Sequence, residues 1–161
     1  MTDLVHVEHA KGKGKAIFSN TDINKGQFVM KITGKIVHRR NVSKRDYAVQ
    51  LDDDLFLEAE GKIDDYLNHS CDPTCRIDVE KMELIATRDI KKGEEITFNY
   101  NTTEYDMIRN GDAFECKCMS KNCAGKVRGF KYLNLSDKKM LKDIISPFLR
   151  KKLDEEIKTK T

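Results

Sequence analysis

The sequence predicts a mainly β fold with helical additions at its C-terminal end. Over residues 4–100, short apolar runs are separated by turns that contain Gly, Asn or Asp. Residues 76–80 and 82–86 alternate polar and apolar side chains on either side of a turn, as in a hairpin with one solvated face. Beyond residue 140, apolar residues return at helical spacing. The 161 residues suffice for one hydrophobic core, so recognition and catalysis would share it.

The expected strands are short and end at turn signals. They cover residues 4–7, 16–18, 27–30, 36–37, 47–52, 55–57, 76–80, 82–86 and 96–100. Asn24-Lys25-Gly26 and Thr33-Gly34 supply turns between the first of them. Residues 38–45 are polar and basic, which indicates a surface loop, and residues 101–113 have the composition of a linker.

The tail is expected to form two helices that break at Ser146. Pro147 suits the first turn of a helix, and serine suits the N-cap position before it. The apolar face of this tail consists of Met140, Leu141, Ile144, Ile145, Phe148, Leu149 and Leu153. One interpretation is that this face packs onto the core, and the other is that it binds a partner protein.

Charge and composition argue against several protein classes. Charged residues make up 35% of the chain but leave a net charge of only +3, which disfavours a dedicated nucleic-acid binder. No signal-peptide core follows Met1, and no apolar run reaches the roughly 18 residues that would span a bilayer. We therefore expect a soluble, intracellular protein with no membrane partner and no direct nucleic-acid site.

Three of the five cysteines lie within eight residues, as Cys116-x-Cys118-x4-Cys123. In a chain without a secretory signal, this spacing favours metal binding over a disulfide framework. A structural zinc ion normally takes four protein ligands, so a fourth ligand must come from elsewhere in the chain.

Two other stretches suggest binding. Asn68–Pro73 reads NHSCDP, and such polar side chains are costly to bury unless they are hydrogen-bonded. An ordinary Asx-rich turn before proline is the alternative. Lys11–Lys15 reads KGKGK, in which glycines let backbone amides and lysine cations approach an anion closely. A flexible basic turn is the alternative there.

The order and spacing of NHSCDP, of GEEITFNY at Gly93–Tyr100 and of the cysteine motif resemble the SET domain of protein lysine methyltransferases with its post-SET zinc motif. The resemblance extends from Lys11 to Cys123. It implies a SET-domain β-clip fold of small sheets, with a C-terminal pseudoknot in which the strand before Tyr100 threads through a loop formed by the Asn68 region. The implied domains are residues 1–110 (SET), 111–134 (zinc-bound post-SET segment) and 135–161 (C-terminal helical extension).

The resemblance also implies roles for individual residues. The implied contacts of the cofactor S-adenosylmethionine are Lys11, Gly12, Lys13, Tyr47, Asn68, His69 and Tyr100. The implied lysine channel consists of Phe98, Tyr47, Val49 and Ile77, and the implied zinc ligands are Cys71, Cys116, Cys118 and Cys123. Tyr100 is the catalytic residue, whose hydroxyl would orient the amine. Tyr47 has an alternative reading as an ordinary strand aromatic, and Cys75 is left over as a small buried residue.

The expected reaction is methyl transfer to a protein lysine, which needs a neutral amine held close to the donor without competing water. Phe98 offers no hydroxyl to anchor a water beside the amine, so we expect di- or trimethylation. The target would be a histone or another basic protein. The acidic run from Asp52 to Asp65 would attract a basic segment, or it is a solvated face. A eukaryotic host would place the enzyme in the nucleus or on chromatin, and a prokaryotic host in the cytoplasm; the sequence indicates no oligomeric state.

Several features depart from the family pattern. Asp65-Tyr66-Leu67 stands where many members carry Arg-Phe-Ile, which puts contacts beneath the cofactor in doubt. Thr74 replaces a frequent asparagine, and Ala124-Gly125-Lys126 replaces a frequent Arg-Gly pair. No cysteine-rich segment precedes the domain, which suggests a compact, stand-alone enzyme.

Two rival functions remain open. An inactive, zinc-stabilised protein-binding module would predict a damaged tyrosine or cofactor turn, and neither is seen in the sequence. A Cys-His hydrolase would use Cys71 and His69, but Pro73 favours a turn over the strand that would point both side chains the same way. Binding of S-adenosylmethionine separates the hydrolase from the methyltransferase.

Overall fold

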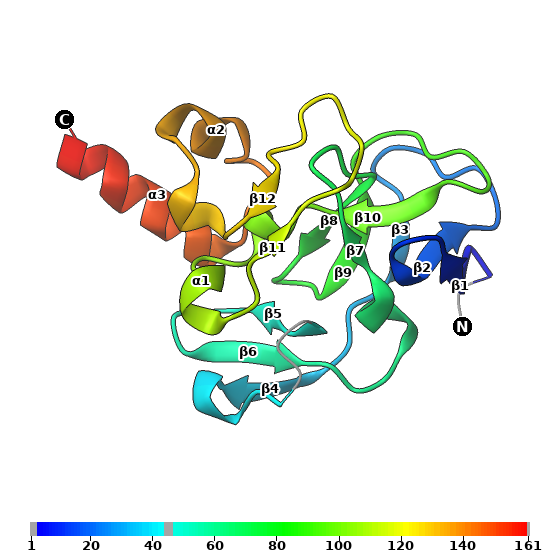
Figure 1. Ribbon diagram of the computed structural model, residues 1–161, viewed down its shortest axis with the longest axis horizontal. Coiled ribbons are helices and arrows are strands. Elements are labelled where there is room, and N and C mark those ends of the chain that lie inside the picture. Colours follow the sequence, from blue (N-terminus) through cyan, green and yellow to red (C-terminus); the bar gives the residue numbers. More distant parts are fainter. Residues whose placement is uncertain (1–2, 44–46, 161) are drawn as a thin grey trace.

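The computed structural model describes residues 3–43 and 47–160. Their strands form four small sheets, three of them around a common core (Figure 1). The first has the order β1 (Val5–Ala10), β2 (Gly14–Ser19), β10 (Glu95–Phe98), β7 (Asn68–His69). The second has the order β3 (Phe28–Lys31), β9 (Glu83–Ala86), β8 (Cys75–Asp78). The third has the order β4 (Lys35–His38), β6 (Leu55–Glu58), β5 (Val49–Gln50), and β11 (Phe114–Glu115) pairs with β12 (Lys126–Val127). The predicted mainly β class is confirmed.

The predicted hairpin is the antiparallel pair β8–β9, in which Ile77 lies opposite Leu84. Burial alternates along both strands, so the period-2 pattern identified the buried face correctly. The predicted loop at 38–45 contains a short 3₁₀ helix, η1 (Arg39–Asn41), and its last two positions lie outside the described residues. The strand expected at 47–52 is limited to β5, at Val49–Gln50.

β10 lies between β2 and β7, antiparallel to the former and parallel to the latter. The segment after β7 then crosses β10: Ser70 N–H donates to the Phe98 carbonyl at 3.1 Å, and Thr97 N–H donates to Thr74 Oγ1 at 2.9 Å. Thr74 Oγ1 in turn donates to the Glu95 carbonyl at 3.3 Å. Residues 68–74 therefore hold β10 along its whole length, which is the expected pseudoknot.

The main core lies between the first three sheets. Its fully buried side chains include those of Ile17, Leu84, Ile90 and Ile96. A second cluster surrounds the cysteines, and a third lies under the C-terminal helices. The remaining short helices are η3 (Ile63–Tyr66), η4 (Tyr100–Thr102), α1 (Met107–Asn110) and η5 (Phe130–Tyr132). Among the described residues, no helix is long and apolar enough to span a membrane.

The helices α2 (Leu135–Met140) and α3 (Pro147–Lys160) form one end of the molecule, far from the N-terminal strands (Figure 1). The predicted break at Ser146 is confirmed: Pro147 begins α3, and Ser146 Oγ accepts from Leu149 N–H at 3.3 Å. Leu149 and Leu153 pack on Phe130, in agreement with the packing interpretation. The first helix lies earlier than expected, because Asn134 caps it and residues 141–144 form turns.

The linker predicted at residues 101–113 is wrong. The segment begins within η4 and contains α1, and its polar residues Asn101, Thr102, Thr103 and Glu104 are all buried. These side chains make internal hydrogen bonds; for example, Asn101 Oδ1 accepts from Gly129 N–H at 3.1 Å. Buried polar groups that are satisfied in this way look like solvated loop residues in the composition alone.

Candidate active site

A cavity of about 800 Å³ opens between the three sheets and the cysteine-containing segment. All predicted cofactor and channel residues line it: Lys11, Gly12, Lys13, Tyr47, Val49, Asn68, His69, Ile77, Phe98 and Tyr100. Residues up to 89 positions apart in sequence thus meet around one space, because the pseudoknot places β7 beside β10. Such a concave site with a few convergent polar groups is typical of ligand binding.

Tyr100 is held from three sides. Its hydroxyl donates to the Leu67 carbonyl at 2.6 Å, and its backbone N–H donates to His69 Nδ1 at 3.0 Å. Its ring lies 4.8 Å from that of Phe98. The strand expected at residues 96–100 is shorter than predicted, since β10 ends at Phe98 and Tyr100 begins η4. The two rings are nonetheless adjacent.

His69 is buried, and its tautomer is fixed by its contacts. Because Nδ1 accepts from Tyr100 N–H, the proton of the neutral ring is on Nε2, which lies 3.3 Å from Cys71 Sγ. Burial, helped by the positive charge of Lys13, lowers the pKa of His69 to about 4. The imidazole is therefore neutral at physiological pH.

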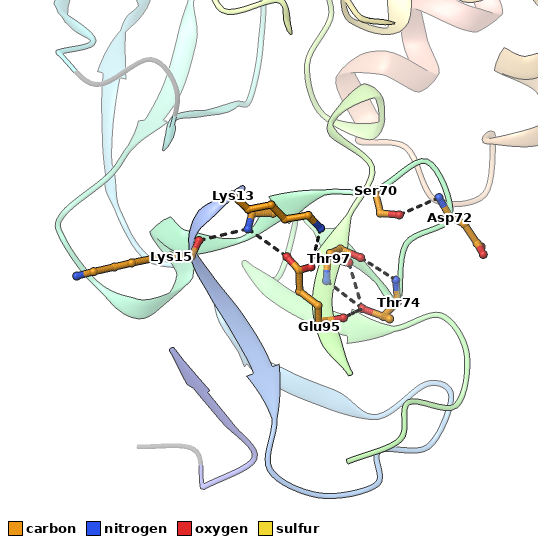
Figure 2. A network of polar contacts seen from close by, with 8 residues as sticks. Lys13, Lys15, Ser70, Asp72, Thr74, Glu95 and Thr97 are labelled. Atoms are coloured by element: carbon orange, nitrogen blue, oxygen red, sulfur yellow. Dashed lines mark hydrogen bonds and ion pairs between the residues drawn. The ribbon is translucent and has the colours of Figure 1, made fainter. Parts of the chain in front are cut away.

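The turn between β1 and β2 carries the predicted cofactor lysines. Gly12 and Gly14 have φ of +78° and +72°, a conformation that L side chains rarely adopt, so this turn favours glycine at both positions. Lys13 Nζ lies 2.8 Å from Glu95 Oε2, and Asn68 Nδ2 donates to Glu95 Oε1 at 3.1 Å (Figure 2). The turn and the pseudoknot are thereby connected across the cavity edge.

The predicted channel wall is apolar. Phe98 and Ile77 are buried, and Val49 is partly buried against the same core. Tyr47 differs, since 49% of it is exposed and it precedes β5 without belonging to the strand. It faces the cavity, and so its reading as an ordinary packed strand aromatic does not hold.

Two cavity residues were missed in the sequence. The Phe114 ring lies edge-on to both His69 and Tyr100, with centroids 5.9 and 5.8 Å away. An aromatic residue immediately before the cysteine motif was the available signal. Glu104 is fully buried, and this burial raises its pKa to about 8, although hydrogen bonds from Thr103 and Gln50 oppose the shift. It was missed because its segment was interpreted as a linker.

The four sulfur atoms of Cys71, Cys116, Cys118 and Cys123 lie within 4.8 Å of one another, and we call them the cysteine cluster. Cys71 Sγ is 3.8 Å from Cys116 Sγ, which matches the spacing of about 3.8 Å expected for tetrahedral thiolates at about 2.3 Å from zinc. The donor set and the distances therefore fit one structural zinc ion. Cys75 is instead buried in the main core, which raises its pKa to about 12.

Comparison with known proteins agrees with this geometry. A family model described as the SET domain matches residues 14–101. The H3 lysine-36 specific histone-lysine N-methyltransferase of Mycosarcoma maydis is 31% identical over 153 residues, which cover 83% of this chain and 15% of that protein. The human protein of the same name is 32% identical over 132 residues, which cover 70% of this chain and 5% of that protein. The chain thus spans only a small part of the length of these relatives.

A solved structure shows the same fold. The crystal structure of KRYPTONITE in complex with mCHH DNA, an H3(1-15) peptide and SAH superposes with a TM-score of 0.61 at 22% sequence identity. The match covers 76% of this chain and 29% of KRYPTONITE. Since the family model alone spans more than half of the sequence, including the pseudoknot strands, the chain belongs to the SET domain family.

Proposed function

We propose that this domain transfers a methyl group from S-adenosylmethionine to the side-chain amine of a protein lysine. The observation that carries the proposal is the single cavity in which the glycine-flanked turn at Lys13, the β7 pair and the Phe98–Tyr100 wall meet. S-adenosylmethionine, when bound, supplies an activated methyl group on its sulfonium. The residues present fit this cofactor, since glycine amides, lysine cations, an asparagine and aromatic rings all line the cavity.

The chain's own residues would act by positioning. Phe98, Ile77 and Val49 form an apolar wall that excludes water from the amine and disfavours its charged form. The Tyr100 hydroxyl donates to the Leu67 carbonyl, so toward the substrate its oxygen would act as the acceptor of an amine N–H. Accepting that hydrogen turns the nitrogen lone pair toward the methyl carbon, where the N–C bond forms as the C–S bond breaks. The product ammonium then loses a proton to solvent.

For the cofactor we assign Lys11, Gly12, Lys13, Tyr47, Asn68 and His69 as its contacts and Tyr100 as shared between cofactor and amine. The cysteine cluster would hold a structural zinc ion with no position open for water. It would fix the Phe114 wall of the cavity, because Cys116 follows β11 directly. Zinc is thus expected to complete the site without taking part in methyl transfer.

The proposed substrate is a lysine within a basic protein segment, and in a eukaryotic host the setting is the nucleus or chromatin. Support comes from the relatives, whose names specify histone H3 lysine 36, and from KRYPTONITE, which was crystallised with an H3 peptide. The acidic run offers complementary charge, although Asp64 and Asp65 already accept from Thr33 and Gly61 amides at 2.8 and 2.6 Å. Raising the ionic strength should increase KM for a basic peptide.

Isothermal titration calorimetry with S-adenosylmethionine, followed by incubation with labelled cofactor, a host lysate and purified H3, tests the proposal. Saturable binding and label on protein lysine are the expected results. Binding without transfer would favour the inactive binding module. Absence of binding would favour the Cys-His hydrolase, for which the His69–Cys71 distance of 3.3 Å is suitable, but the place of Cys71 within the cysteine cluster speaks against it.

A further inference from the structure

Two side chains from distant parts of the chain, those of Lys13 and Asn68, meet at Glu95, the first residue of β10. Its Oε2 accepts from Lys13 Nζ at 2.8 Å, and its Oε1 accepts from Asn68 Nδ2 at 3.1 Å (Figure 2). Asn68 Nδ2 also donates to the Lys15 carbonyl at 3.2 Å. Lys13 and Asn68 line the main cavity and the smaller one beside it, whereas Glu95 is not among the described residues that line either. Glu95 therefore contacts two side chains that line a cavity, those of Lys13 and Asn68, without being among the lining residues itself.

This arrangement determines which edge of the Asn68 amide faces the cavity. A carboxylate and a backbone carbonyl can only accept hydrogen bonds, so the edge of Asn68 that faces Glu95 and Lys15 must be its NH₂ group. Both hydrogens of that group are then used. The amide oxygen Oδ1, on the other edge, is then the acceptor of this side chain.

Lys13 supplies the charge that balances Glu95. Its side chain is 36% exposed and that of Glu95 18%, so solvent screens this ion pair and it contributes little to the stability of the fold. The cation beside Glu95 therefore comes from the β1–β2 turn, and the ion pair ties that turn to β10.

We infer that Glu95 is a positioning residue for cofactor binding, an inference that rests on the proposed function. Glu95 holds Asn68 so that Oδ1 accepts an N–H of the cofactor, and at the same time it neutralises Lys13 beside a ligand that carries a positive sulfonium. S-adenosylmethionine has two kinds of nitrogen donor, its α-ammonium and its adenine amino group. Either donor matches the acceptor that Asn68 presents.

The test uses the variants Glu95→Ala, which removes both contacts, and Glu95→Gln, which keeps an acceptor for Asn68 but loses the charge. Titration calorimetry should show about tenfold weaker binding of S-adenosylmethionine for Glu95→Ala and a smaller loss for Glu95→Gln. In both variants the binding of the cofactor, which has a net positive charge, should weaken more than that of the product S-adenosylhomocysteine, a zwitterion without net charge, because Lys13 is no longer neutralised. A role in stability alone would weaken both ligands equally.

Glu83→Ala is the matched control. Glu83 pairs with Lys31 at 3.1 Å between β9 and β3 and is not among the described residues that line either cavity, so its removal should leave cofactor affinity unchanged. Methylthioadenosine distinguishes the two donors, because it keeps the adenine amino group and lacks the α-ammonium. If Glu95→Ala binds it normally, Oδ1 accepts from the ammonium; if its binding weakens as that of S-adenosylmethionine does, Oδ1 accepts from the adenine.

The inference fails if Glu95→Ala binds both ligands as the unmodified protein does, or if Glu83→Ala shows the same loss. It also fails if affinity falls only together with a large drop in melting temperature in both Glu95 variants. An unmodified protein that binds no cofactor would refute the proposed function and this inference together. Normal binding and transfer by the unmodified protein, with Glu95→Ala unaffected, would refute the inference alone.

Discussion

Replacing Tyr100 by phenylalanine should cut methyl transfer while leaving cofactor binding nearly intact. The variant loses only a hydroxyl, which donates to the Leu67 carbonyl at 2.6 Å and would accept from the substrate amine. The ring contacts with Phe98 and His69, at 4.8 and 5.3 Å between centroids, remain. The fold should therefore lose about 1 kcal/mol, the value of one hydrogen bond.

The catalytic effect should be larger than the stability effect. In the transition state the amine gains positive charge, and a hydrogen bond to a charged group is worth about 1.5–3 kcal/mol. Loss of that bond corresponds to a fall in kcat of about tenfold to 10²-fold. Because the bond forms mainly in the transition state, KM for S-adenosylmethionine should change little.

Steady-state kinetics of Tyr100→Phe and of Tyr132→Phe give the comparison. Tyr132 donates to Asp106 Oδ1 at 2.9 Å and is not among the described residues that line the cavity, so its variant loses a similar hydrogen bond away from the site. Tyr132→Phe should keep full kcat. Near-full activity in Tyr100→Phe would refute the catalytic assignment of Tyr100. An equal loss of kcat in both variants would mean that the loss comes from lower stability and not from catalysis.

The remaining predictions concern the metal, the product and the pH dependence of stability. Serine substitutions at Cys71, Cys116, Cys118 and Cys123 should each lower zinc content measured by atomic emission, whereas Cys75→Ser should retain it; equal loss from Cys75→Ser would contradict the ligand set. Phe98→Tyr should shift the product toward monomethyl-lysine without slowing the first transfer, and mass spectrometry showing only monomethylation by the unmodified protein would contradict the channel argument. The pKa of Glu104 is raised from 4.5 to about 8 in the fold, so the folded state binds the proton more tightly and stability should fall as the pH rises through that window. In the Glu104→Gln variant the urea midpoint of unfolding should fall less as the pH rises. An unchanged pH dependence of that midpoint would show that the Glu104 carboxyl does not cause the loss of stability.

Local chemistry made much of the fold predictable from the sequence. The β8–β9 hairpin followed from period-2 alternation, and the start of α3 followed from the capping chemistry of Ser146 and Pro147. The Cys116–Cys123 motif indicated a metal by spacing alone. Cys71 was different, since it lies 45 positions away from Cys116 and only the family resemblance pointed to it; in the structure its sulfur lies 3.8 Å from that of Cys116.

What stayed beyond sequence reasoning is the buried polar structure that supports the site. Residues 101–104 look like solvated linker, yet Thr103 Oγ1 donates to Glu104 Oε2 at 2.6 Å and Gln50 N–H donates to the same oxygen at 3.1 Å. Gln50 lies in β5, 54 positions before Glu104, so no local pattern reports this pairing. The parallel contact of β7 with β10 is non-local in the same way.

The same reasoning applies to the inferred role of Glu95 in positioning Asn68. Asn68 is an amide whose two ends are similar in size, and the sequence around it gives neither end a preference. Only when β10 enters between β2 and β7 does an acceptor-only carboxylate come within 3.1 Å of the amide nitrogen. The pseudoknot therefore determines the orientation of the Asn68 amide as well as the position of β7. Cofactor affinity in this chain should accordingly be sensitive to β10 residues that never touch the ligand.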